Sequence, residues 1–157
     1  MNALLLLAAL ALAPEIAEPP RHPTITEVLY AVPTTDGDAS GDGTRDASGD
    51  EFVEIANTTD APIQLKGYRL SDRNDASPDR KGGWSFVFPE LELKPSEVAV
   101  VFNGHGCKWT GPVGDTSRAP EGKNEKFHKA YVFTSRNDSD RVGFNNAGDW
   151  VLLSSPD

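Results

Sequence analysis

Cysteine is almost absent from this chain of 157 residues, which contains one, Cys107. A single cysteine cannot form an internal disulfide, and it is too few for a zinc site built on thiolates. The stability of the fold must therefore come from packing, with a bound hard metal ion as a further source.

Excess positive charge is also missing, because the formal net charge is −9. Unassisted binding to nucleic acid or to an anionic membrane depends on Lys and Arg, so the charge argues against both. The sequence contains no G-x-S-x-G, H-E-x-x-H or phosphate-loop motif. Cys107, flanked by His105 and Lys108, is the one candidate nucleophile. A separation of two residues does not imply that a Cys–His pair faces each other, and no catalytic motif is present, so we expect a non-catalytic protein.

No apolar run is long enough to cross a membrane. Residues 3–13, ALLLLAALALA, form the longest one, and a helix of that length spans roughly 16 Å, about half of a bilayer core. A signal peptide explains it better. We expect a short signal helix within residues 1–17, a linker at 18–23, no membrane span in the mature form, and an extracellular or periplasmic protein.

What the chain does contain is typical of β structure: 14 Gly, 12 Pro and many short apolar runs. The patterns predict an all-β fold with strands near residues 24–30, 50–57, 63–65, 68–70, 84–88, 91–93, 98–102 and 150–153. Residues 130–134 fit either a strand or a short helix. The predicted core comprises Val53, Ile55, Leu65, Leu70, Phe86, Phe88, Val100 and Phe102.

An acidic stretch separates the first two predicted strands. Residues 36–51, DGDASGDGTRDASGDE, hold six carboxylates offset by Arg45 alone. From Asp38 onward, side-chain oxygens fall at positions one, three, five and nine, and a glycine falls at position six, as in a calcium loop. We therefore predict one Ca²⁺ ion, which would relieve the repulsion. Its predicted ligands are Asp38, Ser40, Asp42, the Thr44 carbonyl, Asp46, and Asp50 or Glu51.

The match to a calcium loop is incomplete. Gly49 stands at position twelve, where a helical calcium loop has a bidentate Glu, and no amphipathic helix flanks the stretch. Two alternatives stay open. The stretch could be a solvated acidic loop that binds nothing, or the metal site of an accessory part or fragment of a secreted nuclease or protease.

Five segments carry a resemblance: residues 25–29, 50–57 (DEFVEIAN), 63–71 (IQLKGYRLS), 93–95 (LKP, followed by Ser96) and 144–153 (FNNAGDWVLL). In this order they resemble the lamin tail domain family, in which glycine is common at the position of Ser96, and here the type found in secreted bacterial proteins with an acidic insertion. The resemblance implies an immunoglobulin-like β-sandwich over residues 24–157. It brings no catalytic residues, and it implies an interaction or attachment module for an unknown protein or glycan at the cell surface.

Two features depart from a simple sandwich. Residues 103–128 form a long Gly-rich and charged segment, which predicts either a functional loop or a mobile one. Family members usually continue beyond the last matched segment into closing strands. We therefore expect the domain to be C-terminally truncated or its edge to be completed by a partner.

Overall fold

The computed structural model of the chain describes residues 21–136, 138 and 142–156. The predicted signal peptide at 1–17 and the first part of the linker lie outside these residues. The elements are β1 (Thr24–Leu29), β2 (Phe52–Ala56), β3 (Ile63–Gln64), β4 (Arg69–Asp72), β5 (Ser85–Val87), β6 (Glu92–Leu93), β7 (Val98–Phe102), the 3-10 turn η1 (Glu125–Phe127), β8 (Tyr131–Thr134) and β9 (Val151–Ser154).

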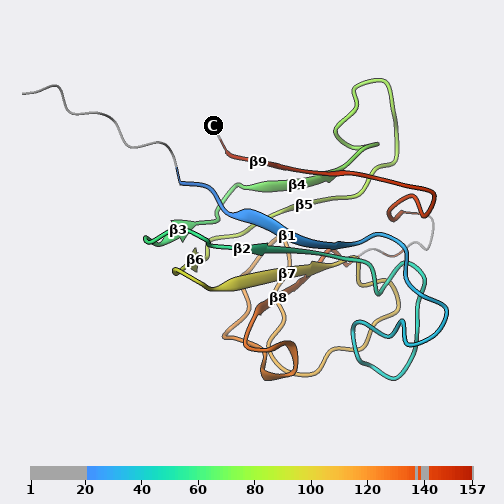
Figure 1. Cartoon of the computed structure of the whole chain (residues 1–157), viewed down its shortest axis with the longest axis horizontal. Coiled ribbons are helices and arrows are strands. Elements are labelled where there is room, and N and C mark those ends of the chain that lie inside the picture. The colour runs from blue at the N-terminus through green and yellow to red at the C-terminus, as the bar shows by residue number, and fades with distance from the viewer. Residues whose placement is uncertain (1–20, 137, 139–141, 157) are drawn as a thin grey trace, which may run out of the picture.

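Two sheets stack in layers, as Figure 1 shows. One sheet has the strand order β1-β2-β7-β8 and the other has the order β5-β4-β9, while β3 and β6 form a small ribbon at one end. Neighbouring strands are antiparallel except β7 and β8, which are parallel. The architecture is an immunoglobulin-like β-sandwich, as the sequence predicted.

The period of two along each strand divides the side chains of the larger sheet between two environments. Val53 and Ile55 of β2 point into the space between the sheets and are fully buried. Phe52 of the same strand points to the outer face, where it packs with Val100 and Phe102 of β7. Strand β7 is therefore apolar on both faces, which fits its position inside the sheet.

Aromatic side chains fill the space between the sheets. Phe86 packs against Phe88 and Phe133 with ring centroids 5.1 and 5.5 Å apart, and Trp84 lies 5.0 Å from Phe144. The predicted aromatic face of residues 84–88 is thus core. All eight predicted core residues are buried: six lie between the sheets, and Val100 and Phe102 lie on the outer face of the larger sheet, under the crossover.

The turn before β7 places Ser96 in a backbone conformation that favours glycine. Ser96 has a φ of 66°, in the left-handed region where glycine is favoured. The turn is closed by the N–H of Glu97, which donates to the Lys94 carbonyl at 3.0 Å, and by the Glu97 carboxylate, which accepts from the Lys94 N–H at 2.9 Å.

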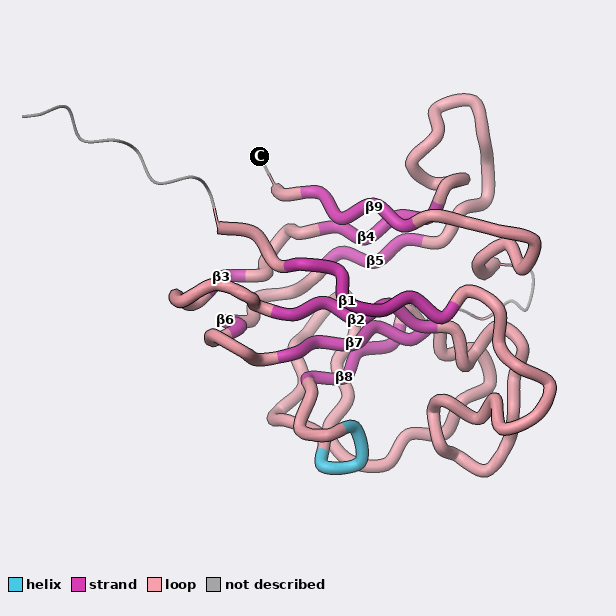
Figure 2. Tube along the Cα trace, in the orientation of Figure 1, coloured by secondary structure: helices cyan, strands magenta, loops and turns pink. Residues whose placement is uncertain are grey.

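The long segment after β7 is a crossover. Parallel neighbours cannot be joined by a tight turn and need a connection of a dozen residues or more. The chain leaves β7 at Phe102, runs below the larger sheet through η1, and returns as β8 (Figure 2). Residues 130–134, for which strand and helix were both open, therefore include a strand.

Candidate functional site

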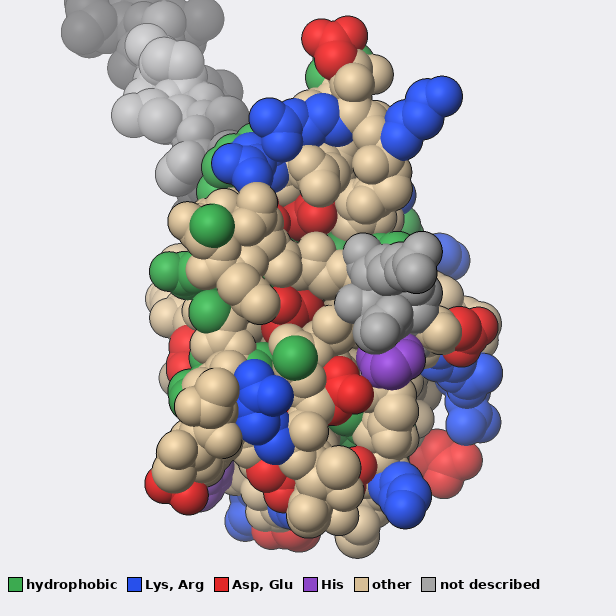
Figure 3. Space-filling view, turned by 90° about the vertical axis from the view of Figure 1, so that its right-hand side faces the viewer, with side chains coloured by type: hydrophobic (Ala, Val, Ile, Leu, Met, Phe, Trp, Pro, Cys, Tyr) green, Lys and Arg blue, Asp and Glu red, His purple; other side chains and the backbone are tan. Residues whose placement is uncertain are grey.

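The acidic loop, residues 36–51, lies at one end of the sandwich beside the start of the crossover. Figure 3 views the molecule from that end, where Asp and Glu side chains are interleaved with Lys and Arg rather than gathered in one acidic patch. Two backbone hydrogen bonds join the loop to the crossover: Gly104 N–H to Gly49 O at 3.0 Å and Asn103 N–H to Glu51 O at 2.9 Å. A Cβ atom on Gly49 would lie 2.0 Å from the His105 carbonyl oxygen, so only glycine fits there.

The first two aspartates of the predicted calcium loop hold the loop's own backbone. Asp38 accepts the N–H groups of Asp42 at 3.0 Å and Gly43 at 2.8 Å. Partial desolvation raises the pKa of Asp38, but these N–H groups more than offset it and lower the pKa below its ordinary value. Asp42 accepts Thr44 N–H and, from the crossover, Lys108 N–H, both at 2.8 Å.

The next two aspartates close the loop on itself and on the crossover. Asp46 accepts two N–H groups, from Ser48 at 2.9 Å and Gly49 at 2.7 Å, and its other oxygen lies 3.3 Å from His105 Nδ1. Asp50 is fully buried, and its two oxygens accept Ser40 N–H and Asp46 N–H at 2.7 Å each. Backbone amides thus supply much of the positive potential that the carboxylates need.

Two cationic side chains also form hydrogen bonds that hold the loop in place. Arg45 donates to the carbonyl oxygens of Pro33 at 2.6 Å and Val32 at 2.8 Å. The ammonium of Lys126, the middle residue of η1, donates to the Gly41 carbonyl. The loop is therefore tied to the segment before it and to the far part of the crossover.

Glu51 is directed to a different part of the structure. Its side chain is buried, and Oε2 accepts the N–H of Phe144 at 3.0 Å and the amide of Asn103 at 3.5 Å. Burial raises the pKa of Glu51 to about 8, against the lowering effect of these donors and with a further rise from nearby Asp149 and Asp46. Glu51 therefore joins the acidic loop to the segment before β9.

The predicted metal ligands all lie in this loop. Among the described residues, no three His, Cys, Asp or Glu side chains gather closely enough to hold a metal ion. The hydrolytic metal site considered as an alternative stays a hypothesis as well. An ionised carboxylate has about four lone-pair sites, so the N–H bonds leave acceptor capacity, and calcium binding stays a prediction of the spacing.

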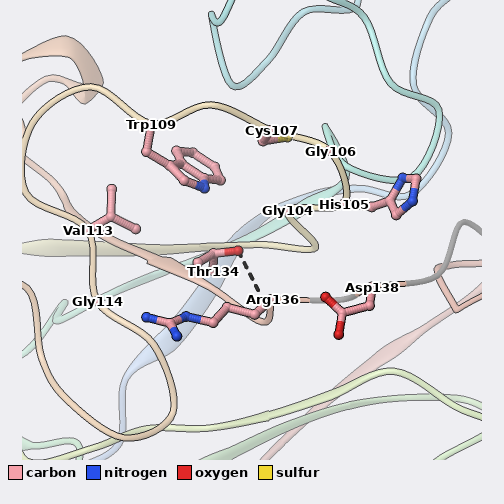
Figure 4. Close-up of a pocket in the computed structure, with 10 residues that line it drawn as sticks. All are labelled: Gly104, His105, Gly106, Cys107, Trp109, Val113, Gly114, Thr134, Arg136 and Asp138. Atoms are coloured by element: carbon pink, nitrogen blue, oxygen red, sulfur yellow. Dashed lines mark hydrogen bonds between the residues drawn. The ribbon is translucent and has the colours of Figure 1, made fainter.

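A cavity of about 600 Å³ opens between the crossover and the end of β8. Figure 4 shows Trp109 and Cys107 on one side, Arg136 and Asp138 on the other, and Thr134 between them. The Arg136 guanidinium pairs with the buried carboxylate of Asp115. This loop-end cavity thus combines an indole, a hydroxyl, a guanidinium and a carboxylate.

The Cys107 thiol in the loop-end cavity is not activated as a nucleophile. Burial raises the pKa of Cys107 to about 11, with a further rise from Asp50, Asp42 and Asp46 against a lowering by Ser40, so the thiol is neutral at pH 7. The thiolate is the reactive form of cysteine, so this sulfur is a weak nucleophile. His105 is hydrogen-bonded to Asp46 rather than to the thiol.

Sequence reasoning missed the cavity because its residues come from two distant segments. Thr134, Arg136 and Asp138 come from the end of β8 and beyond, and they meet residues 104–114 because β8 lies parallel to β7. No short motif signals that pairing. The only available sign was the Gly-rich composition of the long segment.

Comparison with known proteins bears on the whole chain. A search of curated proteins finds no match. Among the described residues, no helix is both long and apolar enough to cross a membrane. The Lamin Tail Domain family matches residues 17–157, which include every strand of the sandwich and the acidic loop. The chain belongs to the lamin tail domain family.

Proposed function

We propose that this chain is an exported, non-catalytic interaction module that holds a protein or glycan of the cell surface at its loop end. The family is immunoglobulin-like, non-enzymatic and of the protein-interaction type. Export is supported by the apolar run at residues 3–13, which has the length and composition of a signal peptide.

One observation carries the proposal: the loop end is braced around an open cavity. Asp42 accepts the N–H of Lys108, and Asp46 contacts His105. The acidic loop therefore fixes the position of the crossover residues that form one side of the cavity. A preorganised surface loses less conformational entropy on binding than a flexible one. The hydrogen bonds between the acidic loop and the crossover therefore favour binding of a ligand in the cavity.

The chemistry of the cavity suits a polar ligand. Its volume of about 600 Å³ lies in the range of roughly 300–1,000 Å³ that ligand sites occupy. The Trp109 indole N–H supplies a donor, and Asp138 supplies an exposed acceptor. A hydroxyl-rich glycan or a polar loop of a protein can bond to both.

Export is tested by N-terminal sequencing of the chain recovered from periplasm and culture medium. The expected mature end is near residue 14 or 18. A product that stays in the cytoplasm with Met1 in place would contradict the proposal.

Binding is tested by the retention of fluorescently labelled chain on intact cells of the producing organism. The double variant Thr134→Val with Asp138→Lys should lower the apparent affinity at least tenfold. Glu90→Lys, an exposed charge reversal beside the β3–β6 ribbon, serves as the matched control and should bind like wild type. Wild type that is not retained, or a double variant retained as well as wild type, would overturn the proposal.

A further inference from the structure

A second hollow lies on a different surface, the outer face of the larger sheet. This outer groove has a volume of about 210 Å³ and runs between the sheet, the acidic loop and the end of η1. Its lining residues are Glu27, Ala39, Phe52, Glu54, Val98, Val100, Phe102, Phe127, His128 and Ala130. It shares no lining residue with the loop-end cavity.

The wall of the outer groove is aromatic. Phe102 lies 5.4 Å, centroid to centroid, from Phe52 on one side and 5.4 Å from Phe127 on the other. Phe52 and Phe127 are only half-buried, so parts of their rings face the groove. Phenyl faces carry negative electrostatic potential and attract a cation within about 6 Å.

The rim of the groove carries two carboxylates that oppose each other. Glu27 of β1 and Glu54 of β2 are direct register partners, and like charges in that position destabilise a sheet. The cause is a bulge after Ile25, which keeps both Ile25 and Val28 toward the core while Glu27 faces Glu54. Thr26, the extra residue of the bulge, donates to Glu54 Oε1 at 2.6 Å.

No cation of the described residues neutralises this pair. None of the ion pairs among those residues involves Glu27 or Glu54. The His128 side chain lines the groove but forms no ion pair with either carboxylate among the described residues. The Lys126 ammonium, which is next to Phe127 in sequence, donates instead to the Gly41 carbonyl. The rim therefore presents negative charge to whatever enters.

The size of the groove decides what can enter. A volume of about 210 Å³ is below the range of roughly 300–1,000 Å³ for small-molecule sites, and it suits one long side chain. Lys and Arg bury their aliphatic stems on apolar surface and keep the charged head at a polar edge. Val98, Val100 and the phenyl rings would contact the stem, and the two carboxylates would bind the head.

We propose that the outer groove binds an arginine or lysine side chain of a partner protein. This site is separate from the loop-end cavity and does not depend on its function. Residues 1–20 contain no Lys or Arg, so they cannot supply the side chain. A second copy of the chain is disfavoured because each copy carries a net charge of −9.

The test is an NMR titration of the ¹⁵N-labelled full chain with the peptide acetyl-Leu-Arg-Leu-amide. The expected result is saturable shifts of backbone amides in β2 and β7. The same peptide with citrulline, a neutral arginine analogue, should bind at least fivefold more weakly. In the double variant Glu27→Gln with Glu54→Gln, the arginine peptide should lose at least tenfold in affinity, which corresponds to about 1.4 kcal/mol.

Controls separate this site from general attraction to an acidic protein. Glu90→Gln with Glu92→Gln removes the same charge near the far ribbon and should leave the affinity unchanged. The Glu27→Gln, Glu54→Gln double variant should stay folded, since removing the repulsion preserves the melting temperature or raises it. Equal binding of the citrulline peptide, unchanged affinity in that double variant, or shifts confined to residues 36–51 would each overturn the proposal.

Discussion

Between the two sheets, Phe86, Phe88 and Phe133 pack ring against ring and are almost completely buried, whereas at the loop end four aspartates and Glu51 hold backbone N–H groups. The first region is stabilised by removing apolar surface from water, which is nearly independent of pH. The second is stabilised by charge, so it responds to protons and ions. One small domain therefore contains a part that tolerates changes of solution and a part that is sensitive to them.

The largest expected effect comes from the core. Phe86→Ala should lower the free energy of unfolding by about 3–5 kcal/mol, since it removes a buried ring and leaves a cavity. Urea denaturation measures the loss, which should be the same at pH 5 and pH 8. Val87→Ala, at the adjacent residue, which is 36% exposed, should cost less than about 1 kcal/mol. Similar losses for both variants would mean that the core is not where the stability resides.

The loop end should make the free energy of unfolding depend on pH. The pKa of Glu51 rises from 4.5 to about 8 on folding, so the folded state holds this proton more tightly than the unfolded state. The stabilisation is complete below about pH 4.5 and is lost as pH rises through 8, on the order of 3 kcal/mol between pH 5 and pH 8. Thermal or urea unfolding across that window measures it.

Glu51→Gln isolates this contribution because glutamine imitates the protonated acid. The variant should match wild type near pH 5 and exceed its stability at pH 8, with a flatter profile between. Glu54→Gln, a half-exposed glutamate of β2, is the matched control and should keep the shape of the wild-type profile. Parallel profiles for wild type and Glu51→Gln would show that Glu51 is not the group that titrates.

Calcium gives the smallest of the three expected effects. If the predicted site forms, a hundredfold excess over Kd stabilises the chain by about 2.7 kcal/mol. Magnesium should substitute poorly, because it requires a small octahedral shell and gives up its waters reluctantly. Melting curves in calcium, magnesium and chelator measure this, with calorimetric titration for direct binding. Asp42→Asn should reduce the calcium effect, and Asp60→Asn, an exposed residue outside the acidic loop, should not.

A chain that does not bind calcium would also give a clear result. Identical melting curves in calcium and chelator, with no heat of binding, would show that the backbone N–H groups alone balance the aspartates. The loop end would then be sensitive to protons and insensitive to divalent ions.

Local pattern predicted most of the fold. Alternation in residues 52–55 and 84–88 located the core, because a half-buried strand must alternate. The pattern at 36–51 singled out the loop that organises one end of the sandwich. The N–H partners of its aspartates, such as Lys108 for Asp42, could not be predicted from spacing, because they depend on how distant segments pack.

What the sequence could not show is non-local. Glu51 and Phe144 are 93 residues apart, and no pattern in either segment predicts their hydrogen bond. The outer groove depends on a bulge in β1, and the loop-end cavity depends on a parallel pair reached through a long crossover. Periodicity describes which face of a strand is apolar, and it contains no information about which strands become neighbours.

The pairing of β4 with β9 joins segments that are far apart in the sequence, and contacts of this kind slow folding. Leu70 lies opposite Leu153, so the smaller sheet is complete only after these two distant segments have met. Closing long loops costs entropy before the distant contacts form, and β-sandwiches typically fold in milliseconds to seconds. During that time the strands have unpaired edges, which makes the unfolded chain prone to aggregation. The export proposed above would benefit from the same delay, since a chain that closes late stays extended for longer.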